Sequence, residues 1–210
     1  MKTSKISMIV KNVAIAFLIS GLACAAGAQH LRVGVDGGFA RFTDESSSGW
    51  NTGFSLGGHA FFLPTPMVQL GLRVAYDHWS PQNGIIIEGL PGGAVNLTSS
   101  GKFTNIEIVP TLRLASAMEA SPLNIFGQAG AGVYLYNSNV TVNGTSSGNS
   151  FSVSSTTASN GNLGVNLGGG VSLGKQSSLA VELFPLYHWV FHGSRTVQYL
   201  TGSLAIMLGV

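Results

Sequence analysis

The feature that most restricts the fold of this chain is the stretch VQLGLRVAYD, residues 68–77, in which apolar and polar side chains alternate without a break. A repeat of two residues is the period of a β-strand, so one face of this strand is apolar and the other is polar. In a water-soluble sheet the apolar face packs inward, whereas in a transmembrane barrel it faces lipid. The alternation alone does not decide between the two.

The same alternation recurs along the chain and predicts a protein built from strands. Each further segment has the length of a strand, and turn-forming residues separate it from the next. With the first stretch there are eight such segments, the other seven being residues 31–39, 53–62, 105–114, 124–136, 162–174, 179–189 and 202–210.

The N-terminal residues have the pattern of a secretory signal peptide. Lys2, Lys5 and Lys11 precede the apolar run VAIAFLISGLACAAGA, which ends in a small-residue cleavage motif. We predict a signal peptide over residues 1–28 and a single mature domain over residues 29–210. Cys24 would leave with the signal peptide, so no disulfide framework is expected in the exported protein.

The composition of the mature chain points to a membrane. Its seven basic residues against eight acidic ones give a formal charge of −1, which does not suit a nucleic-acid-binding protein. Charged residues make up only 9% of the whole chain, against about 25% in soluble domains. No apolar run in the mature part approaches the roughly 20 residues of a transmembrane helix. A closed transmembrane β-barrel satisfies all of these observations.

The lengths of the connections give the topology. The second, fourth and sixth connections are tight, whereas the first, third and fifth are longer, and bacterial outer-membrane barrels have short periplasmic turns and long external loops. The valines of the fifth connection, residues 137–161, favour an outward extension of the flanking strands as a hairpin. The sequence therefore predicts an all-β, eight-stranded, antiparallel up-and-down barrel with both ends of the chain on the periplasmic side.

This topology answers the question of sidedness, because an Arg near the bilayer midplane would cost about 2–4 kcal/mol. The charged rows should therefore face the lumen, where unpaired charges must find partners. We expect Arg73 to contact Asp36 or Glu107. The predicted lumen charge network consists of Arg32, Asp36, Arg73, Asp77, Glu107, Arg113 and Glu182.

Three local patterns add a resemblance to a known group. They are the AGAGVYLY strand at residues 129–136, the Val-Pro step within IEIVPTLRL, and a final strand that runs to Val210. Together they resemble the OmpA/OmpX/OmpW-type small outer-membrane barrels of bacteria. The resemblance implies a monomer in the outer membrane, in contact with its lipid and lipopolysaccharide, assembled by the barrel assembly machinery and able to bind an extracellular ligand through its loops.

Aromatic and proline positions refine this barrel. Eight aromatic residues near the outer strand ends predict an interfacial girdle, with some of them left open as lumen plugs: Tyr76, Trp79, Phe103, Tyr134, Tyr136, Tyr187, Trp189 and Phe191. Pro110 and Pro185 lie within strands and should each mark a bulge or a locally widened pair.

For function, the sequence favours a non-enzymatic barrel that anchors external loops for envelope structure or surface interaction. A narrow pore or conduit for small or hydrophobic solutes is the alternative. A lipid-modifying enzyme is a further alternative, for which the available residues are His188, His192, Ser194 and Glu182. Because these show no nucleophile motif, we predict no catalytic residues. His59 and His188 lack a convergent ligand pattern, so no metal site and no cofactor are predicted.

Overall fold

The computed structural model describes residues 31–43, 49–84, 89–116, 122–158, 161–174, 178–193 and 195–209. The predicted signal peptide and the last residue lie outside these ranges. The described residues form nine strands: β1 (Leu31–Phe42), β2 (Gly53–Phe62), β3 (Val68–Trp79), β4 (Val95–Ala115), β5 (Leu123–Ser146), β6 (Asn149–Ala158), β7 (Asn162–Gly174), β8 (Leu179–His192) and β9 (Arg195–Gly209).

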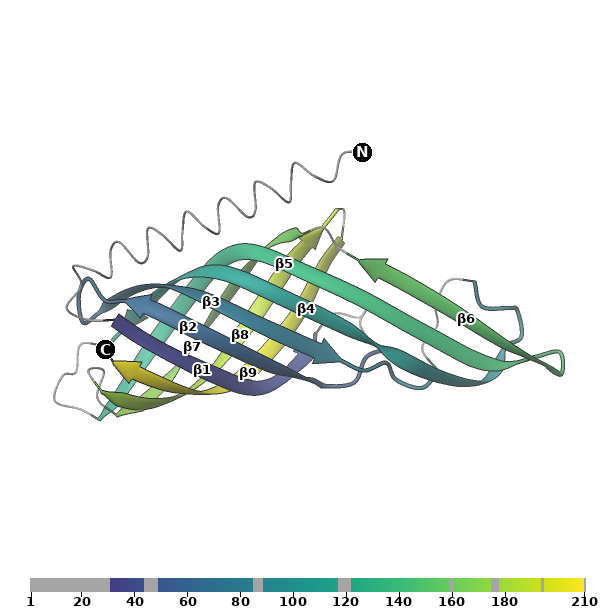
Figure 1. The fold of residues 1–210 in the computed structure, drawn as a ribbon, viewed down its shortest axis with the longest axis horizontal. Coiled ribbons are helices and arrows are strands. Elements are labelled where there is room, and N and C mark those ends of the chain that lie inside the picture. Colours follow the sequence, from purple (N-terminus) through teal and green to yellow (C-terminus); the bar gives the residue numbers. More distant parts are fainter. Residues whose placement is uncertain are drawn as a thin grey trace.

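Eight of these strands close into a ring, which confirms the predicted barrel (Figure 1). The hydrogen-bonded order is β4-β3-β2-β1-β9-β8-β7-β5, and a further pairing of β4 with β5 completes the circle. The first and last strands pair antiparallel from Arg32↔Gly209 to Phe42↔Tyr199. All neighbouring pairs are antiparallel, as an up-and-down barrel requires.

The ninth strand, β6, lies outside the ring and pairs only with the outer half of β5. The turn at Ser147 and Gly148 joins β5 and β6, and both of its residues have positive φ. The fifth connection is thus the outward hairpin that its valines predicted. The third connection differs from prediction: residues 95–101 continue β4 as a strand instead of forming a loop, because they pair with β5 beyond the barrel.

The sidedness of the strands follows the sequence pattern. In β3, Arg73 is fully buried inside the barrel, while 44% of the surface of its neighbour Val74 is exposed on the outside. Leu112, Leu167 and Ile206 are exposed in the same way on other strands. The outer wall is therefore an apolar belt, and the charged rows face the interior. In the described ranges, no helix has the length and hydrophobicity needed to cross a bilayer.

The two strand prolines interrupt the ladder without shifting it. β4 and β5 pair in the same register on either side of Pro110, as β7 and β8 do around Pro185. The predicted bulge is therefore wrong at both prolines. Each proline instead lies in a short stretch that is unpaired with that neighbouring strand, as expected of a locally widened pair. Opposite the second of these stretches, Gly170 lies so close to the carbonyl oxygen of Leu183 that a Cβ there would collide with it. The glycine run in β7 thus allows β7 and β8 to approach one another closely.

Candidate functional site: the barrel interior

All seven residues of the predicted charge network lie inside the barrel. They come from four strands, and none exposes more than 5% of its surface. They are Arg32 and Asp36 on β1, Arg73 and Asp77 on β3, Glu107 and Arg113 on β4, and Glu182 on β8. Each sits at an inward position of its strand because the alternation places it there.

One group of charges centres on Arg73. Its guanidinium lies 3.3 Å from Asp36 Oδ2 and also pairs with Glu107, so it contacts both of the acids that the sequence offered as partners. The side chain of His59 joins the group, with Nε2 at 2.6 Å from Asp36 Oδ1. A buried carboxylate needs such partners, because an uncompensated charge in this environment costs several kcal/mol.

A second group centres on Glu182. Arg32 donates to its Oε1 at 3.1 Å and Arg113 to its Oε2 at 2.8 Å. The Arg113 guanidinium also lies over the rings of Phe61 and Phe126, at 4.3 and 4.0 Å from their centroids. This arginine is therefore held by charge and by two aromatic faces.

Asp77 differs from the other acids, because none of the ion pairs in the described part of the chain involves it. Asn105 and the hydroxyl of Tyr199 donate to its Oδ2, at 3.0 and 3.2 Å. The ring of Tyr199 stacks on His188 with the centroids 4.3 Å apart, and His188 Nδ1 lies 3.2 Å from Glu107 Oε2. Hydrogen-bonding side chains thus tie Asp77 to the group that contains Glu107.

An aromatic layer closes the interior at the long-loop end. It consists of five rings that contact one another at centroid distances of 4.6 to 6.5 Å: Phe42, Trp50, Trp79, Phe103 and Tyr199. Trp79 also donates its indole N–H to the carbonyl oxygen of Ala40 at 3.0 Å. Trp79, Tyr134 and Phe103, which the sequence assigned either to a girdle or to a plug, belong to the interior.

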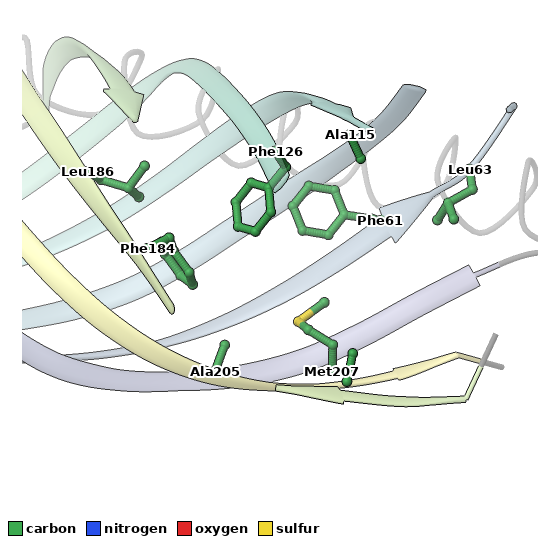
Figure 2. Close-up of a cluster of buried hydrophobic side chains, with 9 residues drawn as sticks. Phe61, Leu63, Ala115, Phe126, Phe184, Leu186, Ala205 and Met207 are labelled. Carbon is green, nitrogen blue, oxygen red and sulfur yellow. The ribbon is translucent and has the colours of Figure 1, made fainter. Parts of the chain in front are cut away.

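An apolar layer closes the short-turn end (Figure 2). Figure 2 shows Phe61, Phe126, Phe184 and Met207 reaching from different sides of the barrel toward its axis. Ala115, Ala180, Ala205, Leu63 and Leu186 complete the cluster. The charged groups therefore lie between an aromatic layer and an apolar layer.

The residues available for the enzyme alternative do not assemble within the described ranges. The carboxylate of Glu182 is held by two arginines, and His188 is fully buried against Tyr199. His192 bonds instead with Tyr136 and Asn162, at 2.8 and 3.0 Å, while Ser194 lies outside the described residues. No group of three or more His, Cys, Asp or Glu side chains in those ranges could hold a metal ion.

No protein-family model matches the sequence, and no curated relative matches it. Solved structures do match. Neisserial surface protein A (NspA) aligns with a TM-score of 0.52 and 16% identity, over 85% of this chain and 96% of that one. A major outer membrane protein from Thermus thermophilus aligns with a TM-score of 0.51 and 12% identity, over 86% and 99%. The fold is that of the small outer-membrane β-barrels.

The outer membrane enzyme PagL also aligns, with a TM-score of 0.44 and 14% identity, over 85% of this chain and 99% of that one. At identities this low, the alignments with NspA and the Thermus protein establish the barrel fold and not an activity.

Proposed function

We propose that this chain is a non-enzymatic protein of the bacterial outer membrane, whose barrel anchors external structure for envelope integrity or surface interaction. Three observations support the proposal. The outer wall is an apolar belt, the charges are sealed inside, and the strands β4, β5 and β6 project beyond the ring at the long-loop end (Figure 1). In this proposal the barrel is the rigid anchor for the projecting parts of β4, β5 and β6.

The closure of the interior is the observation that favours this proposal over a pore. An eight-stranded barrel encloses just enough space for side chains to fill it. Here the aromatic layer and the apolar layer lie across the two ends, and the arginines between them are engaged by acids. A solute would have to displace packed rings and break buried ion pairs to cross.

Planar bilayer recordings test this closure. We expect the purified protein to insert without steady single-channel openings, because the layers leave no continuous polar path. Steady openings that are abolished by Arg73→Ala, and retained by the exposed variant Arg41→Ala, would favour the pore instead.

Shortening the projecting hairpin tests the division between anchor and projection. Thr141–Ser154 can be replaced by an Asn-Gly turn, which joins the register partners Val140 and Ser155 by a favoured two-residue hairpin loop. We expect the free energy of unfolding of the barrel to change by less than about 1 kcal/mol, because the removed residues pair only within the hairpin and with the projecting part of β4, and not with the ring. Chemical unfolding in detergent micelles measures this change.

Binding of whole cells to an immobilised protein surface or to one another gives the second readout for the shortened protein. Under the proposal this binding falls while the barrel remains folded. Unfolding of the barrel on shortening would instead show that the hairpin is part of its stability, and would contradict the separation of roles.

A further inference from the structure

The three strands that project from the ring form a sheet with two unlike faces. One face is covered: Val140 and Val142 on β5 expose 3% and 0% of their surface. On this face Gly144 lies between Leu97 and Phe151, and Gly92, in the described part of the connection between β3 and β4, lies against it, since Ser146 Oγ donates to the Gly92 carbonyl oxygen at 2.9 Å. The opposite face carries the exposed side chain of Val95 beside Thr145 at its outer end, and is otherwise polar from Lys102 outward.

We call this opposite face the hydroxyl face. Its side chains are exposed or half-exposed, and apart from Val95 at the outer end and one lysine they are uncharged hydroxyls or amides. The hydroxyl face consists of Thr98, Ser100 and Lys102 on β4, Asn139, Thr141, Asn143 and Thr145 on β5, and Ser150, Ser152, Ser154 and Thr156 on β6.

The strand register arranges these side chains in straight rows across the sheet. Asn143 pairs with Thr98 on one side and Ser152 on the other, Thr141 with Ser100 and Ser154, and Asn139 with Lys102 and Thr156. Neighbouring rows are about 7 Å apart along the strands, and neighbouring strands about 4.8 Å apart. The result is a regular array of neutral hydrogen-bonding groups.

The hydroxyl face is the direct continuation of the lipid-facing wall of the barrel. On β4 and β5 the outward-facing apolar pair Ile106↔Leu135 is followed by Thr104↔Asn137 and then by Lys102↔Asn139. The same side of the sheet therefore changes from apolar to polar where the strands leave the belt. In a bilayer, the molecules that stand against this face are the head groups of the lipids that surround the belt.

We propose that the hydroxyl face binds the saccharide portion of glycolipids in the outer leaflet, an inference that rests on the proposed outer-membrane location. Neutral donors and acceptors complement the hydroxyl groups of a sugar chain. Lys102, in the row of this face nearest the belt, is placed to meet a phosphate substituent on the sugars next to the acyl chains. The face lacks the Trp, Tyr and Arg anchors typical of protein interfaces, and its single cation does not make a nucleic-acid surface.

Amide hydrogen exchange in vesicles tests this proposal. The protein is inserted into phosphatidylcholine vesicles that contain either lipid A alone or lipopolysaccharide with its full saccharide. We expect the amides of β6, Asn149–Ala158, to exchange about tenfold more slowly with lipopolysaccharide than with lipid A, because sugar contacts suppress local opening of the hairpin.

A matched pair of double variants isolates the face. Ser152→Ala with Thr156→Val removes two hydroxyls from the hydroxyl face, and Ser155→Ala with Thr157→Val removes two from the opposite face of the same strand. We expect the first variant to reduce the tenfold ratio to about threefold or less and the second to retain it, since each rate is compared with the same variant in lipid A.

Three results would overturn the inference. These are equal exchange rates of the wild-type protein in the two vesicles, equal ratios for the two variants, or slowing that grows with protein density in lipid A, which would assign the face to a second copy of the chain. Failure to insert into either vesicle would overturn the proposed location as well. Insertion without a saccharide effect would overturn this inference alone.

Discussion

Replacing Arg73 by methionine should lower the free energy of unfolding by about 3–5 kcal/mol, the cost of breaking a buried ion pair by removing one partner. Arg73 is fully buried and contacts both Asp36 and Glu107. Methionine fills part of the same space but leaves two carboxylates without their shared cation. Urea unfolding in lipid vesicles, followed by tryptophan fluorescence, measures the loss.

Two controls separate the charge effect from packing. Arg41→Met makes the same change at an exposed position of β1 and should alter the free energy of unfolding by about 0.5 kcal/mol or less. Adding Asp36→Asn and Glu107→Gln to Arg73→Met removes the stranded charges and should recover a large part of the loss. A loss below about 1 kcal/mol for Arg73→Met alone would show that water or protons already compensate these acids.

The sequence predicted the barrel because its main determinant is local. Alternation of apolar and polar residues fixes which side chains point inward, and the lack of charge on one parity fixes which side meets lipid. Arg73 and Val74, neighbours in β3, lie on opposite sides as expected. The pairing of Arg73 with Asp36 and Glu107 was also accessible, because β3 pairs with β4, only β2 separates it from β1, and the candidate acids lie at similar heights.

The partners of Arg113 could not be predicted in this way. Its acid, Glu182, lies on β8, and two other strands separate β8 from β4 around the ring. Alternation gives the face of a residue but not its angular position or its height across a tilted barrel. Contacts across the lumen can therefore be identified only from the three-dimensional structure.

Tyr199 is one interior residue that the sequence analysis missed. The last predicted strand began at Gly202, whereas β9 begins at Arg195 and brings the Tyr199 ring inside, where it contacts both Asp77 and His188. The available signal was the shared parity of Val197, Tyr199 and Thr201, which places their side chains on one side of the strand. It was obscured because Gln198 and Leu200 do not form a uniform outward row.

Placing an arginine at Val74 should destabilise the folded barrel by about 2–4 kcal/mol, the cost of a cation on the lipid face near the midplane. Val74 lies in the middle of β3, with 44% of its surface exposed on the apolar belt. Unfolding of Val74→Arg in vesicles, compared with wild type, measures the cost. Val74→Leu keeps the side chain apolar and should change the free energy of unfolding by less than about 1 kcal/mol.

The force of this test comes from the neighbouring residue. Arg73 carries the same guanidinium one position earlier, and the structure buries it among acids. If the belt faces lipid, an arginine stabilises the folded barrel at position 73 and destabilises it at position 74. If Val74→Arg were as stable in vesicles as Val74→Leu, the apolar wall would not be in contact with hydrocarbon. The outer-membrane location and the lipid-facing continuation of the hydroxyl face would then both lose their physical basis.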